Sequence, residues 1–197
     1  MKGGMKMKIY CAGPLFNEKE REEMSEIANV LEKNIFKVFL PQRDGLLFSE
    51  LYSMGVKLGY EEEIVSKVLR RAIFELDSYA VIEECDGLVL NINGRVPDEG
   101  ALIEGAWAWC NKKYVVIYKS DSRGLINGLD NPLIEGLSLL EYVEKIEDIP
   151  SAFHKLASAN GSHFEKVISR GRKIFDLILN KSPKKIVIKK LLEEIGE

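Results

Sequence analysis

The sequence predicts an α/β fold, a flavodoxin-like or Rossmann-like doubly wound parallel sheet of about five strands with a C-terminal helical extension. Short apolar runs alternate with longer segments of helical period, which is typical of βαβ units with parallel strands. Polar turn residues directly follow the apolar runs, at the strand ends where parallel sheets form their sites. With 197 residues, of which 46% are hydrophobic, the chain suits one α/β domain with an extension.

The first strand is predicted over residues 8–12. Gly13 follows it directly, and a glycine at this point lets a ligand approach the backbone closely. Asn17 and Glu20 form a capping pair, so a helix should run from there to about Lys33. Neither a dinucleotide-binding GxGxxG motif nor a P-loop follows this strand.

The second strand is predicted over residues 36–40 and ends in a polar turn that carries Gln42 and Asp44. Taken alone, that turn is a connection built on proline and an Asp-Gly pair. A long amphipathic helix is predicted from about 61 to 84, because its apolar residues recur with the helical period. Asp77 lies near its apolar stripe, and taken alone it is a solvated residue.

A third strand, residues 87–90, is followed by a polar loop, a helix of small and aromatic residues, and a fourth strand at 114–118. Asp98 lies in the loop or at the cap of that helix, and Glu104 lies six positions later. The neighbours of Glu104 are uncharged, and a carboxylate in such a helix is costly to bury unless it is paired or used. Exposure to solvent between the apolar positions is the alternative interpretation of Glu104.

The rest of the chain begins with a long loop at 119–132 and a short fifth strand at 139–143. Long connections without secondary structure are uncommon and often functional. Helical patterns follow, so we place a domain boundary between 1–148 and 149–197. The apolar stripe of a helix over 164–178 needs a partner, either the domain or a second subunit, and together with the loop it predicts a homo-oligomer.

Charge and cysteine content argue against several classes of protein. The formal charge is −3, so nothing in the balance suggests a nucleic-acid polymer as partner. No apolar run reaches the ~18 residues that span a bilayer, and the N-terminus lacks an apolar signal core. Cys11, Cys85 and Cys110 form no CxxC motif, and reduced, buried thiols are typical of cytoplasmic proteins. We therefore expect a cytoplasmic protein without a membrane partner.

A doubly wound sheet would gather the polar residues of its strand ends in one crevice. The predicted crevice is rich in carboxylates and contains no histidine, no lysine and no metal-like cluster. The two histidines, His154 and His163, lie in the C-terminal helices, which argues against Ser-His-Asp chemistry. Carboxylates alone suit glycoside chemistry, in which an anionic oxygen traps an oxocarbenium-like sugar carbon. We expect neither a metal nor a cofactor.

Three segments together resemble the nucleoside 2-deoxyribosyltransferase family. They are Tyr10–Leu15 (Tyr-x-Ala-Gly-Pro-Leu), Pro41–Asp44 (Pro-Gln-x-Asp) and Pro97–Ala108, in which an Asp and a Glu stand six positions apart. The resemblance covers about residues 8–145, and Asp77 matches it on the helix before the third strand. In one departure, the family's usual Glu-x-Gly-x-Ala becomes Glu-Gly-Ala, a change among small residues that should leave the glutamate in position.

The resemblance implies catalytic roles for four residues. Glu104 corresponds to the nucleophile that attacks C1′ of a deoxynucleoside, and Tyr10 corresponds to the hydroxyl that orients this carboxylate. Asp77 and Asp98 correspond to the pair that hydrogen-bonds the base and supplies its leaving proton.

Four further positions imply contacts to the substrate. Gln42 and Asp44 stand where the family holds base and sugar contacts, and Gly13 lets the substrate approach the first strand. Asn131 resembles an asparagine that a neighbouring subunit donates to the sugar's 5′-hydroxyl. The implied partners are small-molecule nucleosides and nucleobases, and the implied process is nucleotide salvage.

The resemblance thus implies transfer of 2-deoxyribose between nucleobases, by a retaining double displacement through a covalent ester on Glu104. Two alternatives stay open. One is an N-glycosidase that hydrolyses nucleosides or nucleoside 5′-monophosphates. Arg43 and Arg95 keep the monophosphate alternative open, whereas a phosphate beside Asp98 would be repelled. The other alternative is a non-catalytic nucleotide-binding module.

Overall fold

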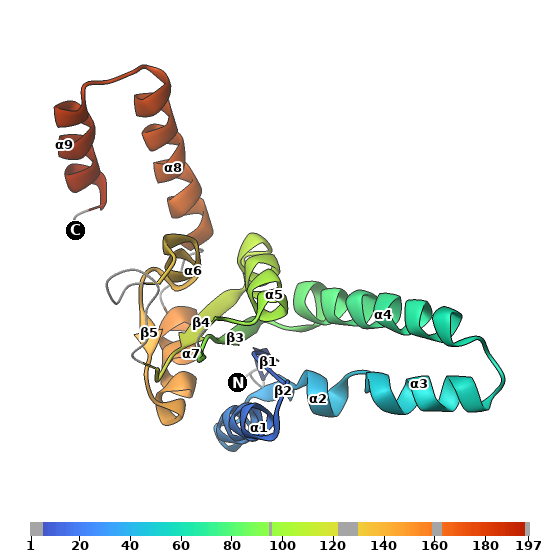
Figure 1. Ribbon diagram of the computed structural model, residues 1–197. Coiled ribbons are helices and arrows are strands. Elements are labelled where there is room, and N and C mark those ends of the chain that lie inside the picture. Colours follow the sequence, from blue (N-terminus) through green and yellow to red (C-terminus); the bar gives the residue numbers. More distant parts are fainter. Residues whose placement is uncertain (1–5, 95, 122–129, 159–162, 196–197) are drawn as a thin grey trace. The chain divides into compact units, whose positions relative to one another are not determined.

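The computed structural model of the chain describes residues 6–94, 96–121, 130–158 and 163–195. A sheet of five parallel strands lies at its centre, in the order β2-β1-β3-β4-β5 (Figure 1). This is the flavodoxin-like order, and it confirms the predicted doubly wound fold. The strands are β1 (Lys8–Ala12), β2 (Lys37–Phe39), β3 (Gly87–Asn91), β4 (Tyr114–Tyr118) and β5 (Tyr142–Val143), the last of which is shorter than predicted.

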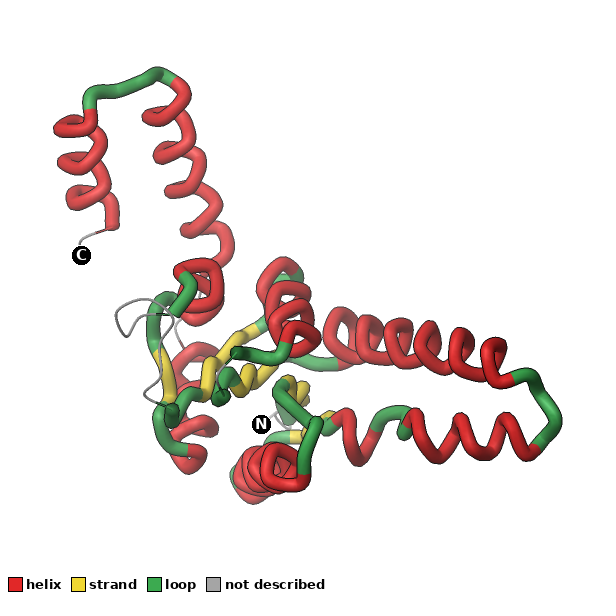
Figure 2. Tube along the Cα trace, viewed as in Figure 1, coloured by secondary structure: helices red, strands yellow, loops and turns green. Residues whose placement is uncertain are grey.

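Helices connect the strands, and further helices come after the last strand in the sequence (Figure 2). The α-helices are α1 (Glu18–Lys33), α2 (Pro41–Asp44), α3 (Phe48–Lys57), α4 (Glu62–Tyr79), α5 (Glu99–Cys110), α6 (Pro132–Glu135), α7 (Ile149–Ser158), α8 (His163–Leu179) and α9 (Lys184–Ile195). Shorter segments are the π-helical turn η1 (Ala80–Glu84) and the 3₁₀ turns η2 (Gly136–Ser138) and η3 (Ile146–Asp148).

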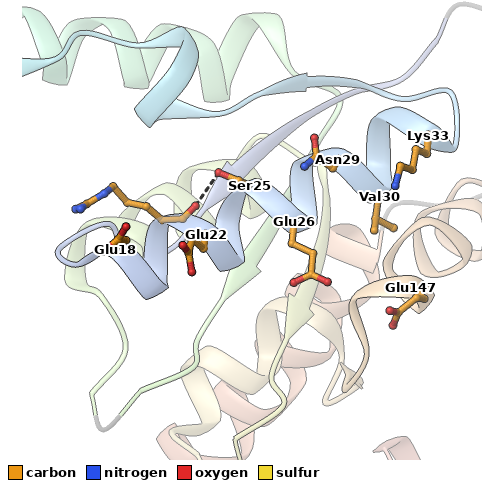
Figure 3. Close-up of a pocket in the computed structure, with 9 residues that line it drawn as sticks. Glu18, Glu22, Ser25, Glu26, Asn29, Val30, Lys33 and Glu147 are labelled. Atoms are coloured by element: carbon orange, nitrogen blue, oxygen red, sulfur yellow. Dashed lines mark hydrogen bonds between the residues drawn. The ribbon is translucent and has the colours of Figure 1, made fainter.

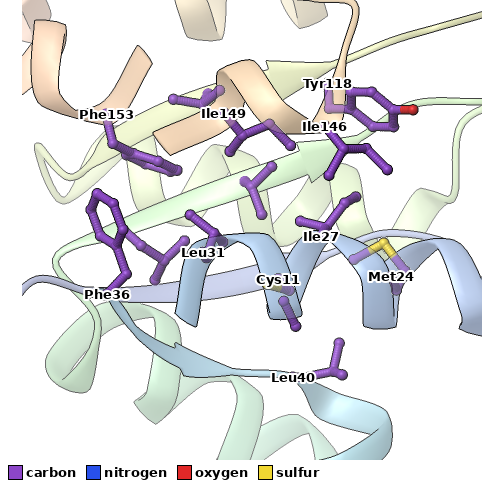
Figure 4. Packing of buried hydrophobic residues seen from close by; sticks show 14 residues of the cluster. Cys11, Met24, Ile27, Leu31, Phe36, Leu40, Tyr118, Ile146, Ile149 and Phe153 are labelled. Atoms are coloured by element: carbon purple, nitrogen blue, oxygen red, sulfur yellow. The ribbon is translucent and has the colours of Figure 1, made fainter. Parts of the chain in front are cut away.

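The two faces of the sheet carry separate apolar clusters. Helices α1 and α7 cover one face, and α5 with η1 covers the other. Figure 4 shows the first cluster, where Met24, Ile27 and Leu31 of α1 lie near Ile149 and Phe153 of α7. These positions recur at helical spacing, and each fully buried side chain of this size contributes roughly 1.5–3 kcal/mol.

The order of the strands creates a crevice beside β1. From β1 the chain moves to β2 on one side, and it later returns to β3 on the other side of β1. The register pairs Ala12 with Leu90, so the carboxyl ends of β1 and β3 lie at the same edge. The segments that leave these two strands diverge to opposite faces, and such a switch point is the usual place of a site.

Helices α3 and α4 pack against each other and differ in part from the prediction. Gly55 lies within α3, and a Cβ there would stand 2.8 Å from the Val65 side chain of α4. The glycine therefore permits the close approach of the two helices. The long helix predicted to Glu84 ends as an α-helix at Tyr79 and continues as the π-helical turn η1.

The chain divides into two compact units, Met1–Ala159 and Asn160–Glu197. Helix α7 belongs to the first unit, because Ile149, Pro150 and Phe153 are buried there, although the sequence placed this helix in the extension. The described part of the second unit consists of α8 and α9, which pack against each other. None of the helices in the described ranges is both long enough and apolar enough to cross a bilayer.

Candidate active site

A cleft of about 630 Å³ lies at the carboxyl ends of β1 and β3. It contains three of the four predicted catalytic residues, namely Asp77 of α4, Asp98 before α5 and Glu104 of α5. Its other walls come from the loop after β1 and from the segment between α2 and α3. The remaining lining residues are Cys11, Gly13, Leu15, Phe16, Arg21, Pro41, Gln42, Gly45, Leu46, Leu47, Phe48, Ser49, Ile73, Gly100 and Ala101.

Glu104 faces the cleft from the second turn of α5 and is partly buried. Its Oε1 accepts a hydrogen bond of 2.7 Å from the Tyr10 hydroxyl, although the two residues are 94 positions apart. Burial raises the pKa of Glu104 to about 8; the hydrogen bond from Tyr10 lowers it, and the charges of Asp77 and Asp98 raise it. The alternative of a solvated Glu104 is therefore wrong.

Tyr10 holds Glu104 from the centre of the sheet. Its side chain is fully buried on β1, and its ring stacks on Phe39 with centroids 5.4 Å apart. Burial, together with the nearby charges of Glu104 and Asp77, raises the pKa of Tyr10 far above its ordinary value. The hydroxyl therefore stays protonated and acts as a donor toward the carboxylate.

Asp77 and Asp98 occupy different electrostatic environments. Burial raises the pKa of Asp77, and the neighbouring Tyr10 hydroxyl opposes this shift. Asp98 is the N-cap of α5, where its Oδ2 accepts a hydrogen bond of 2.7 Å from the Ala101 amide. Asp77 therefore retains its proton more readily than an ordinary aspartate. One oxygen of Asp98 is engaged by the helix.

Comparisons with known proteins relate the chain to one family. The model of the nucleoside 2-deoxyribosyltransferase family matches residues 9–168. The chain belongs to this family. The predicted family is therefore confirmed, and membership points to an enzyme of the deoxyribosyltransferase class. None of the curated proteins that were compared with the chain matches it.

Several solved structures are similar to this chain at low sequence identity. A conserved protein from Enterococcus faecalis V583 is 22% identical, over 77% of this chain and 99% of its own, with a TM-score of 0.56. A 2-deoxyribosyltransferase from Bacillus psychrosaccharolyticus is 21% identical, over 73% and 90%, with a TM-score of 0.49. A CMP N-glycosidase from Clostridium botulinum is 16% identical, over 75% and 98%, with a TM-score of 0.42.

Gly13 and Gln42, two of the predicted substrate contacts, line the cleft. A Cβ on Gly13 would stand 2.5 Å from the Met24 sulfur and 2.9 Å from Asn91, so packing beneath the cleft requires a glycine. The Gln42 Nε2 donates to the Arg21 carbonyl oxygen at 2.8 Å and to the Ser25 hydroxyl oxygen at 2.7 Å. The Gln42 Oε1 is buried without a hydrogen-bond partner among the described residues.

Asp44 has structural partners and does not line the cleft. Its Oδ2 accepts a hydrogen bond of 2.8 Å from the Leu40 amide, and its carboxylate pairs with Arg43. Burial alone would raise the pKa of Asp44, but the bonds from Arg43 and Leu40 lower it overall. Arg43 also pairs with Glu32 at 2.9 Å. A direct contact of Asp44 with a substrate stays a prediction.

Asn131, the last predicted contact, is exposed and lies outside the cleft of its own chain. Its side-chain oxygen caps α6 by accepting from the Leu133 amide at 2.9 Å, which leaves its NH₂ group as a donor. Arg95 and residues 122–129 of the predicted loop lie outside the described residues. The role of Asn131 toward a neighbouring subunit stays a prediction.

The sequence analysis missed the wall formed by Leu46, Leu47 and Phe48, and it missed Arg21. Leu46, Leu47 and Phe48 follow the Asp-Gly turn, and an apolar triplet after a turn was the signal that could have found them. Arg21 begins the second turn of the predicted helix, where nothing in the local pattern shows that its side chain faces the cleft. No group of three or more metal-ligating side chains occurs in the part of the chain that the structure describes.

A second hollow of about 640 Å³ lies along the outer side of α1 (Figure 3). Its labelled side chains include Glu18, Glu22 and Glu26, which follow one another at four-residue spacing on the helix, and Glu147. None of the predicted site residues lines it. An acidic helix face of this kind is a solvated surface, so we assign the chemistry to the cleft at the strand ends.

Proposed function

We propose that the protein transfers 2-deoxyribose between nucleobases through a covalent deoxyribosyl ester on Glu104. The observation that carries this proposal is the 2.7 Å hydrogen bond from Tyr10 to Glu104 in a cleft that also holds Asp77 and Asp98. One carboxylate is oriented toward the cleft by a buried donor, and two further carboxyls lie beside it. Nucleophile, orienting group and general acid are the parts that a double displacement at a sugar carbon needs.

In the first step, ionised Glu104 attacks C1′ of a deoxynucleoside. A bond forms between its carboxylate oxygen and C1′, the C1′–N bond breaks, and the electron pair passes to the base. The base takes a proton from a neighbouring carboxyl, for which Asp77 is suited because burial raises its pKa. As Glu104 loses its charge on forming the ester, the repulsion that Asp98 exerts on it disappears.

In the second step, a nitrogen of a new base attacks C1′ from the face that the first base left. The ester bond breaks, Glu104 recovers its charge, and the configuration at C1′ is retained after two inversions. Transfer competes with hydrolysis, so the cleft must hold a base and keep water out. The apolar side chains of Phe16, Leu47 and Phe48 support this requirement.

Two observations favour a nucleoside over its 5′-monophosphate. At the start of α1, the amides of Phe16 and Asn17 donate to the Glu20 carboxylate at 2.8 and 3.3 Å, so they are not available to a phosphate. Arg43, the residue that kept the monophosphate alternative open, forms ion pairs with Asp44 and Glu32. We therefore expect a deoxynucleoside to react faster than its 5′-monophosphate.

The deciding experiment is a base-exchange assay with a panel of deoxynucleosides and free bases, read by chromatography. We expect added base to accelerate donor consumption and an exchanged nucleoside to appear. If added base changes nothing and free deoxyribose accumulates, the protein is a hydrolase and not a transferase.

A variant identifies the nucleophile. Glu104→Gln should fold normally and lose at least about 1,000-fold in turnover, because a neutral amide cannot form the ester. Glu99→Gln removes an exposed carboxylate from the first turn of the same helix and should leave turnover unchanged. Unchanged behaviour of Glu104→Gln would instead support a non-catalytic nucleotide-binding module.

A further inference from the structure

Arg21 is a cationic residue that lines the cleft and also borders the hollow along the outer side of α1. It extends from α1, and its Nη1 donates to the Leu15 carbonyl oxygen at 3.1 Å, which ties the guanidinium to the loop after β1. None of the ion pairs between described residues includes Arg21, whereas Arg43 is paired with Asp44 and Glu32. Arg21 therefore keeps donors that the protein itself does not use in the described ranges.

Arg21 lies in the part of the cleft where we expect the base of the substrate, away from the helix that carries the nucleophile. The main-chain carbonyl oxygen of Arg21 accepts a hydrogen bond from the side-chain amide of Gln42, so the two residues lie in the same wall of the cleft. Phe16 and Phe48 line the same cleft and suit a planar ring. Glu104 reaches the cleft from α5, on the other face of the sheet from α1. A base that leaves a sugar held at Glu104 would thus move toward the wall of Arg21.

We propose that Arg21 stabilises the negative charge that a keto base develops as it leaves C1′. This inference rests on the proposed function. As the Glu104 oxygen bonds to C1′, the C1′–N electron pair passes to the base nitrogen and is delocalised onto a ring carbonyl oxygen. The guanidinium donates a hydrogen bond to that oxygen and gives up no proton, since arginine stays charged in proteins. The base is protonated on nitrogen afterwards by a carboxyl.

The consequence is a distinction between substrates. A carboxyl such as Asp77 assists departure by giving a proton, which serves bases that accept one readily. The 2,4-dioxopyrimidines are weak proton acceptors and leave with more negative charge, so they depend more on a fixed cation. Donors aimed at developing charge are typically worth about 10²–10³ in rate. Because of Arg21, we expect deoxynucleosides of keto bases to be among the substrates that bind in the cleft.

The experiment compares two donors that differ in leaving ability, thymidine and 5-fluoro-2′-deoxyuridine, by the single-turnover rate of ester formation. Arg21→Gln should lower the rate about 100-fold with thymidine and less than about tenfold with the fluorinated donor, whose base carries negative charge more easily. Arg21→Lys keeps the charge and should recover part of the loss. Lys19→Gln removes a cation of the same helix outside the cleft and should change neither rate.

Several results would overturn the assignment. An equal loss with both donors, or no loss with either, would show that Arg21 does not act on the leaving base. Faster reaction of 5′-monophosphates that is lost in Arg21→Gln would make it a phosphate ligand. Melting temperatures identify a variant that fails to fold, and the Arg21→Lys comparison then decides. If the wild type consumes no deoxynucleoside at all, the proposed function itself fails, and this inference fails with it.

Discussion

Glu104 carries its charge at a cost in free energy. Burial raises its pKa to about 8, the Tyr10 hydroxyl lowers it, and the charges of Asp77 and Asp98 raise it. If Glu104 is the nucleophile, only its ionised form can attack C1′. The burial that keeps water from the ester would then hold much of the free enzyme in the protonated form near neutral pH. Function at this residue depends on the balance between desolvation and one hydrogen bond.

Replacing Tyr10 with phenylalanine tests that balance. The change removes the hydrogen bond that lowers the pKa of Glu104, so this pKa should rise further above 8. We expect the pH profile of kcat/KM to have a rising limb that reports ionisation of Glu104 and a falling limb that reports the general acid, and the midpoint of the rising limb should be displaced to higher pH in Tyr10→Phe. Phe39→Leu, which alters the ring that stacks on Tyr10 but keeps its hydroxyl, serves as control. A midpoint that stays in place would contradict the assigned role of Tyr10.

The same pKa predicts how stability depends on pH. Glu104 holds a proton more tightly in the folded than in the unfolded state, so its contribution to stability is fully present below the unfolded pKa of 4.5 and is lost as pH rises through about 8. Glu104→Gln cannot ionise and escapes this loss. Its melting temperature should match that of the wild type near pH 4.5 and exceed it increasingly toward pH 8. A constant difference across this range would argue against a buried ionisation.

At the scale of elements, the start of α5 combines a structural and a chemical task. Asp98 caps the helix through the Ala101 amide at 2.7 Å, and the same helix carries Glu104 in its second turn. The cap fixes where the helix begins and therefore which face turns toward the cleft. On the other wall, α4 ends at Tyr79, two residues after Asp77, and the chain continues as the π-helical turn η1. Such turns often occur at functional sites.

Two substitutions separate the tasks of Asp98. Serine can still accept the bond from the Ala101 amide but carries no charge, so Asp98→Ser should keep stability near wild type and lower turnover. Asp98→Ala loses the cap as well and should cost about 1 kcal/mol in the free energy of unfolding. Denaturant unfolding and the base-exchange rate measure the two effects. Equal stability of the two variants would show that the cap contributes little.

At the scale of the molecule, large apolar side chains remain exposed on both units. In the first unit they include Met54 of α3, Leu58 directly after α3 and Val68 of α4, and in the second unit Phe175 and Leu192. No described residue of α8 or α9 is buried. A unit of this size rarely holds its fold by its own core, so its apolar faces need a covering surface.

We expect the protein to form a homo-oligomer that covers part of this surface. Light scattering at micromolar concentration should give a mass above that of one chain. Phe175→Glu places a charge on the apolar stripe of α8 and should shift the mass toward the monomer, whereas Ser169→Glu, on the polar side of the same helix, should not. An active monomer would contradict this prediction and also the contribution of Asn131 from a neighbouring subunit.

The local sequence by itself determined the approximate strands and the capping box of α1, and it placed Asp98 in the loop or at the cap of the following helix. Period and cap chemistry act between residues a few positions apart, so they are readable without the fold. The parallel, doubly wound class of the sheet also followed, since the alternation of apolar runs and helices predicts parallel strands with a crevice at their carboxyl ends. The family motif added candidate roles for Glu104, Tyr10 and Asp77.

Pairing between distant segments decided the rest. The bond from Tyr10 to Glu104 joins β1 to α5 across 94 positions, and it depends on the register in which β1 lies beside β3. Contacts of this kind also placed Arg21 at the cleft and paired Arg43 with Glu32. Local pattern cannot supply them, because the pKa and the available donors of a side chain are set by the neighbours that folding brings to it.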